Sequence, residues 1–148
     1  MQALNFPSYN FRLKSTENST LIFDVIRKKF VVLQPEEWVR QHTVHFLHHT
    51  KRYPKSLLNV EKQLIVNGLK KRYDVLLFNA DGSIHTLVEC KAPSVAITQA
   101  TFNQIAIYNL KLKANYLMVT NGLQHYYCQM NHKEEKYTFL TEIPDFSR

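Results

Sequence analysis

The chain is poor in residues and motifs that mark several common protein classes. Among its 148 residues there are two cysteines, Cys90 and Cys128, and three glycines, Gly68, Gly82 and Gly122. Two cysteines cannot make a disulfide framework, and this scarcity favours a cytoplasmic protein. The sequence contains no GxxxxGK segment, which excludes the phosphate-binding loop of an ATP-driven motor.

Long apolar segments are also missing. No run approaches the roughly 18 residues that cross a bilayer as a helix. The N-terminal sequence MQALNFPSYNFRLKS lacks the charged start and apolar block of a signal peptide. Apolar residues nevertheless make up 45% of the chain and aromatic residues 12%. We therefore expect one folded domain over residues 1–148, with residues 1–33 as an N-terminal arm of strands, and no association with membranes.

Acidic residues are the scarcer charged class. The chain has 19 Lys and Arg against 12 Asp and Glu, which gives a net charge of +7. A basic domain of this size is attracted to polyanions such as DNA, although a basic surface that serves only solubility gives the same count. Basic residues gather in two short segments, where they can follow phosphates or stand in solvent. These residues are Lys51, Arg52, Lys55, Lys70, Lys71 and Arg72.

The hydrophobic pattern predicts two N-terminal strands and then a helix. The segment STLIFDVIRKKFVVL, residues 19–33, has two apolar stretches around a turn near Arg27–Lys29. Pro35 suits the first position of a helix, and the helix should end before Pro54. Side chains that recur at helical spacing between these prolines are Trp38, Val39, Thr43, Phe46 and Leu47.

Strand patterns follow the first helix. Three strands are expected within residues 56–68, 70–82 and 83–93. Asn67–Gly68 and Asp81–Gly82 are strong hairpin signals, so we expect tight turns between neighbouring strands at these two places. Each of these strands should therefore be antiparallel to its neighbour.

A crossover and a hairpin complete the predicted sheet. Residues 98–114 should form a second helix that leads to a fourth strand within residues 115–122. That strand should be parallel to the third, in a right-handed crossover. Residues 123–131 and 136–144 then form a closing hairpin. The predicted fold class is α/β (α+β), a mixed β-sheet flanked by helices. The buried stripe of the second helix is Phe102, Ile105, Ala106 and Leu112.

A glutamate and a lysine interrupt the third strand, in the sequence LVECKAP. Residues two apart on a strand point to the same face, so Glu89 and Lys91 should project together, with Cys90 behind them as a small buried residue. A tight turn centred on Asp81–Gly82 places Asp74 directly opposite Glu89, with carbons about 5 Å apart. Two carboxylates that close repel each other unless a cation lies between them.

The simpler alternative for these charges is an exposed cross-strand ion pair. The flanking segments Val75–Phe78 and Leu87–Val88 are too apolar for a surface strand. Charged groups buried there cost several kcal/mol unless they are paired or bind a metal. A divalent metal such as Mg²⁺ or Mn²⁺ with oxygen ligands, and a lysine beside it, form a set of groups suited to phosphodiester hydrolysis.

These residues and their spacing resemble a known nuclease group. Asp74 followed by Glu89-Cys90-Lys91, spaced as D-x14-E-x-K, resembles the PD-(D/E)xK nuclease superfamily, although Tyr73 stands where the motif has proline. More narrowly, VECKAPSVAITQATFNQIAIYN resembles the N-terminal nuclease domain of the R subunit of type I restriction enzymes. Gln104 and Tyr108 match the QxxxY motif of this group and lie one helical turn apart.

The resemblance extends over residues 23–129 and implies a restriction-endonuclease-like core with a defined metal site. By this resemblance Asp74 and Glu89 bind the metal, and the backbone carbonyl of Cys90 supplies another ligand. Lys91 then corresponds to the catalytic lysine that positions or activates the attacking water.

The resemblance also implies supporting residues. Gln104 and Tyr108 correspond to residues that position the DNA backbone or the active-site lysine. Some superfamily members add a glutamate from the first helix, for which Glu37 is the first candidate and Glu36 the second. Compensation of the helix dipole explains both glutamates equally well. Glu61 is another nearby acid, which can equally be a surface charge.

The implied function is a metal-dependent DNA endonuclease of restriction type, or the nuclease subunit of one. DNA is then the main partner, and a motor or specificity subunit is a further one, because this chain has no motor sequence. The alternative is a nuclease-derived module that binds nucleic acid or a protein partner without cutting. The joint presence of Asp74, Glu89 and Lys91 favours the enzyme.

A second metal hypothesis comes from the histidine-rich segment HTVHFLHH. His45 and His49 are four residues apart on the first predicted helix, a spacing that can bind zinc. No third ligand is evident nearby in the sequence. A polar or DNA-facing histidine surface is therefore the preferred interpretation.

Overall fold

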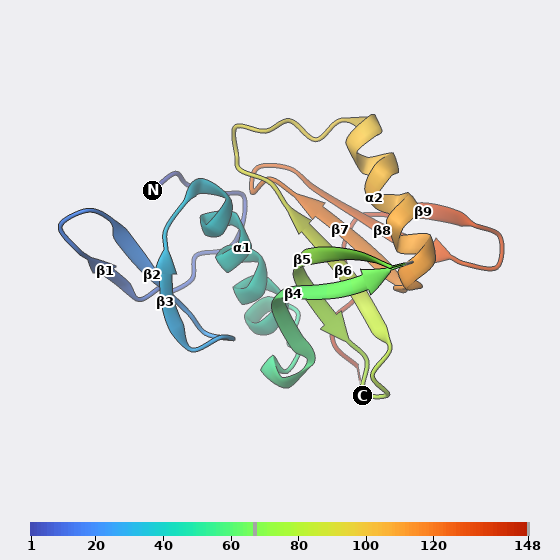
Figure 1. The fold of residues 1–148 in the computed structure, drawn as a ribbon, viewed down its shortest axis with the longest axis horizontal. Coiled ribbons are helices and arrows are strands. Elements are labelled where there is room, and N and C mark those ends of the chain that lie inside the picture. Colours follow the sequence, from blue (N-terminus) through green and yellow to red (C-terminus); the bar gives the residue numbers. More distant parts are fainter. Residues whose placement is uncertain (67, 148) are drawn as a thin grey trace.

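Two β-sheets and two principal helices form the structure. The computed structural model describes residues 1–66 and 68–147, without the side chains of Val66 and Tyr108, and in this part of the chain it contains a three-stranded and a six-stranded sheet. Helix α1 lies between the smaller and the larger sheet, and α2 covers another part of the larger sheet (Figure 1). The predicted mixed α/β architecture is confirmed.

The N-terminal arm forms the smaller sheet. Its strands are β1 (Leu13–Ser15), β2 (Thr20–Asp24) and β3 (Lys29–Val32), and both neighbouring pairs are antiparallel. The two predicted strands and the turn between them are confirmed. Strand β1 was not predicted, because its three residues, LKS, are all exposed and show no alternation of apolar and polar side chains.

Helix α1 begins at Pro35, as predicted, and runs to His45. The chain then continues as one π-helical turn, Phe46–Thr50, and a 3-10 turn at Lys55–Leu57. The continuous helical segment, α1 and the π turn, ends at Thr50 and so before Pro54, as predicted, but the π turn itself was not predicted. Thr43, in the last turn of α1, is fully buried. None of the helices in the described residues is long and apolar enough to span a membrane.

The larger sheet has the predicted order of elements. Its strands are β4 (Leu58–Val66), β5 (Leu69–Phe78), β6 (Ile84–Cys90), β7 (Tyr116–Thr120), β8 (His125–Asn131) and β9 (Lys136–Leu140), and α2 spans Gln99–Leu112. The strands pair in chain order, and β6 and β7 are parallel, as the crossover prediction required. The predicted Asn67–Gly68 turn falls in part on Asn67, which lies outside the described residues.

The core lies on both faces of the larger sheet. Val75, Leu77 and Val88 belong to the cluster that packs against α1, whereas Leu76 and Leu87 belong to the cluster that packs against α2. All five side chains are fully buried. The expectation that these two strands are buried on both faces is therefore confirmed. Asp74 and Glu89, which directly adjoin these buried residues in β5 and β6, are consequently shielded from much of the solvent.

Candidate active site

Strands β5 and β6 bring Asp74 and Glu89 together. Val75 pairs with Val88, and one further step along this register brings Asp74 opposite Glu89. The connection is a loop over residues 79–83 and not the predicted two-residue turn, because Phe78 pairs with Ile84. A β-bulge between Leu77 and Phe78 shifts the register by one residue and restores the expected alignment.

The carboxyl group of Asp74 is held in an environment that disfavours its charge. Its Oδ2 accepts a hydrogen bond of 2.7 Å from the backbone N–H of Cys90. Burial and the negative charges of Glu89, Glu36 and Glu61 outweigh this bond and raise the pKa of Asp74 to about 8. In the protein without a bound cation, this environment favours the protonated form of Asp74.

Glu89 is the more deeply buried member of the pair, with 8% of its surface exposed. Burial raises the pKa of Glu89, and the positive charges of Lys71 and Lys91 oppose part of the rise. The Oε1 atom has no hydrogen-bond partner, and the Lys71 ammonium lies 3.7 Å from it. A buried carboxylate oxygen without a hydrogen bond fits a cation that takes oxygen ligands.

A third carboxylate lies at the same level of the sheet. Glu61 stands in β4 between the pairs Val60–Val75 and Lys62–Tyr73, and therefore next to Asp74. Its φ of 51° interrupts the regular ladder, since a residue other than glycine rarely adopts this conformation in a strand. Burial raises the pKa of Glu61, which is partly offset by Arg40.

The acids of this basic chain are concentrated around the pair. Six of the 12 acidic residues interact here, directly or through Arg40. They are Asp24, Glu36, Glu37, Glu61, Asp74 and Glu89. Three of the six, Asp24, Glu37 and Glu61, contact the buried Arg40.

Arg40 is the buried cation that links several of these acids. Its side chain contacts Asp24 at 2.8 Å through Nη2, Glu61 at 3.6 Å through Nε, and Glu37 through both nitrogens. Glu37 also accepts a 2.9 Å hydrogen bond from Gln41. Glu37 is thus ion-paired with Arg40. The exposed Glu36 is the acid of α1 whose negative charge helps to raise the pKa of Asp74. Sequence reasoning missed Arg40, whose one signal is its spacing of three residues from Glu37.

Two lysines flank the carboxylate pair. Lys91 directly follows β6, is half-buried, and donates its backbone N–H to Thr120 at 2.8 Å. The structure places it close enough to Glu89 to influence the pKa of that group. Lys71 was predicted only as a member of a phosphate-following cluster, because the sequence does not reveal that its ammonium reaches Glu89 from β5.

The remaining motif residues take different positions. Cys90 is buried, its Sγ lies 3.8 Å from Thr43 Oγ1 and faces α1, and burial raises the pKa of its thiol well above the usual range. The expectation of a small buried cysteine is confirmed. Gln104 is exposed on α2. Tyr108 belongs to the same helix, but its side chain lies outside the described part of the structure.

The histidines of the first helical segment pack with aromatic rings. His45 and His49 have ring centroids 5.3 Å apart, and His45 also lies against Tyr9 and Phe11. Burial and neighbouring histidines lower the pKa of His45 to about 4. Within residues 1–66 and 68–147 no group of three or more His, Cys, Asp or Glu side chains is arranged to hold a metal ion. The zinc hypothesis therefore gains no support here.

Comparison with known proteins gives one family. The model of the type I restriction enzyme R protein N terminus matches residues 35–144. The matched segment runs from the start of α1 past the end of β9, and it contains Asp74, Glu89 and Lys91. It leaves the smaller sheet outside. A search of curated proteins gave no match.

Proposed function

Because the chain belongs to the family of type I restriction enzyme R protein N termini, we propose that it is a metal-dependent DNA endonuclease or the nuclease subunit of a restriction-type system. One observation carries the proposal. The partly buried Asp74 and the buried Glu89 lie opposite each other on neighbouring strands, with Lys71 and Lys91 beside them. This combination of acids and cations suits phosphodiester hydrolysis.

In this proposal Asp74, Glu89 and the backbone carbonyl of Cys90 hold Mg²⁺ or Mn²⁺. The raised pKa values of both acids, and the buried Oε1 of Glu89 that accepts no hydrogen bond, support a cation here. The bound ion supplies Lewis-acid stabilisation of the negative charge that develops at the phosphate. Glu37 is not a metal ligand in this proposal, because its carboxylate already accepts hydrogen bonds from Arg40 and Gln41.

The chain's own cations and helix α2 perform the remaining tasks. The Lys91 ammonium orients the attacking water and offsets negative charge in the transition state. Lys71 balances part of the charge of Glu89 and opposes the rise in its pKa that burial causes. Gln104 and Tyr108 contact the DNA backbone or steady Lys91. By the family context, a motor or specificity subunit is the protein partner in this proposal.

A binding module that does not cut DNA is the second candidate. The raised pKa of Asp74 favours its neutral form, which would let the pair persist without any metal and so favours the alternative. The presence of both acids and Lys91 favours cleavage.

Single-turnover cleavage of supercoiled plasmid, with Mg²⁺ or Mn²⁺ and with EDTA as a control, decides between the two functions. Lys91→Ala should cut at least about a hundredfold more slowly while it keeps metal and DNA affinity, because Lys91 acts mainly in the transition state. Lys91→Arg should rescue poorly, because a planar guanidinium does not replace a compact ammonium.

The matched control is Lys111→Ala, which removes an exposed lysine of α2 and should leave the rate unchanged. A wild-type rate for Lys91→Ala would remove Lys91 from the mechanism. A wild-type protein that binds DNA but cuts no form of it with either metal would make the binding module the better account.

A further inference from the structure

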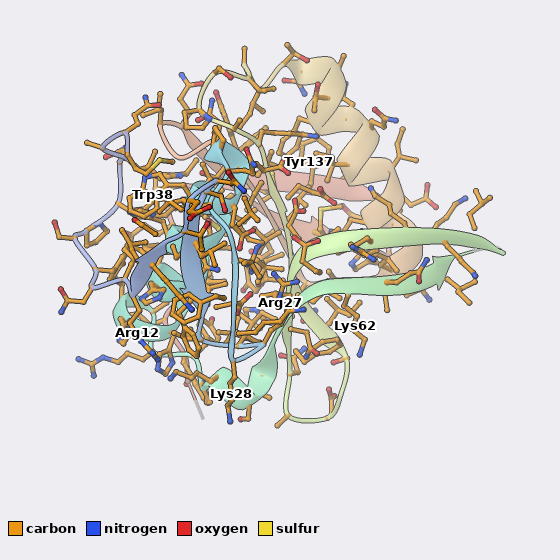
Figure 2. All side chains as sticks on the ribbon, turned by 60° about the vertical axis from the view of Figure 1, so that its left-hand side comes forward. Arg12, Arg27, Lys28, Trp38, Lys62 and Tyr137 are labelled. Carbon is orange, nitrogen blue, oxygen red and sulfur yellow. The ribbon has the colours of Figure 1, made fainter. Side chains whose placement is uncertain are left out.

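The β4–β5 hairpin extends beyond the larger sheet. In the described part of the chain, β5 pairs with β6 over Val75–Phe78, whereas the first half of β5 pairs with β4 alone. Residues 62–66 and 69–73 therefore form a two-stranded ribbon without a third strand. Figure 2 shows these paired strands projecting away from the body of the molecule. We refer to residues 62–66 and 69–73 as the ribbon.

The ribbon is basic and has no acidic residue of its own. Lys62, Lys70 and Arg72 are exposed on it, and residues 62–73 contain no Asp or Glu. Ile65 and Leu69, near its tip, are 70% and 65% exposed. A two-stranded hairpin with exposed aliphatic side chains gains little stability in water, so this composition fits a surface that contacts a partner.

The base of the ribbon coincides with the candidate active site. Glu61 directly precedes one strand of the ribbon, and Asp74 directly follows the other. Lys71 of the ribbon lies 3.7 Å from Glu89. A polyanion that follows the cations of the ribbon is therefore led to the carboxylate pair.

We propose that the ribbon is a DNA-binding arm that lies in the major groove of duplex DNA and guides the backbone to Asp74 and Glu89. This inference rests on the proposed nuclease function. A two-stranded β-ribbon fits the major groove, which is about 12 Å wide, and five paired residues per strand span about 17 Å. Lys62, Lys70 and Arg72 contact phosphates, and the aliphatic tip contacts apolar base edges such as thymine methyl groups.

The test removes three cations from the ribbon, as Lys62→Gln, Lys70→Gln and Arg72→Gln together. Binding to a short duplex is measured by fluorescence anisotropy in Ca²⁺, between about 50 and 200 mM salt. The affinity should fall at least about tenfold, and the salt dependence should weaken by about one logarithmic slope unit per lost phosphate contact. The melting temperature is recorded for each variant to verify folding.

The control removes three exposed lysines far from the ribbon in sequence, as Lys29→Gln, Lys133→Gln and Lys136→Gln. It changes the net charge equally and should lower the affinity by less than about threefold if the effect is local. An equal loss of DNA affinity in the two variants would overturn the proposal that the ribbon is a DNA-binding arm. Wild-type affinity in the ribbon variant would overturn it as well.

A second variant keeps every charge and addresses the tip. Ile65→Ser with Leu69→Ser should weaken duplex binding without changing its salt dependence, because apolar contacts release no counterions. Unchanged affinity would overturn the placement of the tip in the groove. If the wild-type protein binds no DNA at any salt concentration, the proposed function fails together with the arm. If only the arm proposal fails, the wild-type protein still binds and cleaves DNA, and the ribbon variant binds it as well as the wild type does.

Discussion

At the scale of single residues, Asp74 has the most informative environment. Its ordinary pKa of 3.8 rises to about 8, first through burial and then through the charge of Glu89. The ionised form is therefore disfavoured in the folded protein relative to the unfolded chain. The raised pKa of Asp74 therefore contributes to the free energy of unfolding in full below about pH 4, near the pKa in the unfolded chain. This contribution is lost as pH rises toward the folded pKa of about 8.

We predict that Asp74→Asn stabilises the metal-free protein, because the amide imitates the protonated acid and does not ionise. In EDTA, its melting temperature should match the wild type near pH 4 and exceed it by at least about 3 °C at pH 8. Added Mg²⁺ should raise the melting temperature of the wild type only. Glu134→Gln, at an exposed position, is the control. A lower melting temperature for Asp74→Asn than for the wild type at pH 8 would contradict the assignment.

At the scale of elements, Arg40 connects three parts of the fold. From α1 it reaches Asp24 in β2 and Glu61 in β4, and its side chain is almost fully buried. Asp24 is buried to the same degree and also pairs with Arg27 at 2.8 Å. The network joins the smaller sheet to the helix and to the strand that carries the ribbon.

Arg40→Met should destabilise the protein by about 3–5 kcal/mol, because it leaves the carboxylates of Asp24, Glu37 and Glu61 without their shared cation. Denaturant unfolding followed by circular dichroism measures the free energy. Lys111→Met removes an exposed charge and should change it by less than about 0.5 kcal/mol. Adding Asp24→Asn to Arg40→Met should recover part of the loss, since one buried charge is then removed. A cost below about 1 kcal/mol for Arg40→Met would show that the network is not needed for stability.

At the scale of the whole molecule, the N-terminal arm lies outside the family match and is nevertheless bound to the rest of the chain. The backbone N–H of Asn5 donates to Gly122 at 2.7 Å, and Trp38 donates its ring N–H to Gln2 at 2.8 Å. Ile22 of the smaller sheet is completely buried. The match at residues 35–144 therefore marks the domain that the chain shares with its family, and the folding of this domain here also involves the arm.

Removal of residues 1–33 should lower the stability by roughly 5 kcal/mol or more, because the truncated chain loses Asp24 opposite the buried Arg40 and exposes apolar surface. Thermal melts and amide NMR spectra of residues 34–148 measure the effect. A control protein that lacks only residues 1–3 should melt close to the full chain if the smaller sheet carries the effect. Full-chain stability for residues 34–148 would mean that the arm is an independent appendage.

The sequence by itself determined the order of elements and the central pair of acids. Apolar periodicity and turn residues are local signals, so α1, α2 and the strands from β4 to β9 were predictable. The Asp74–Glu89 register was predictable for a related reason, since neighbouring strands joined by a short loop have few alternative alignments. Even there, the tertiary structure used a longer loop and a bulge to reach the same register.

Only the tertiary structure decided how distant segments meet the pair. It placed Lys71 beside Glu89, engaged Glu37 with Arg40, and brought Glu61 to the level of Asp74. These contacts depend on which elements pack against each other and on a positive φ at Glu61, which the apolar periodicity of each element does not specify. A charged residue that is ion-paired in the interior has the same letter as one in solvent, and burial distinguishes the two only after the chain has folded.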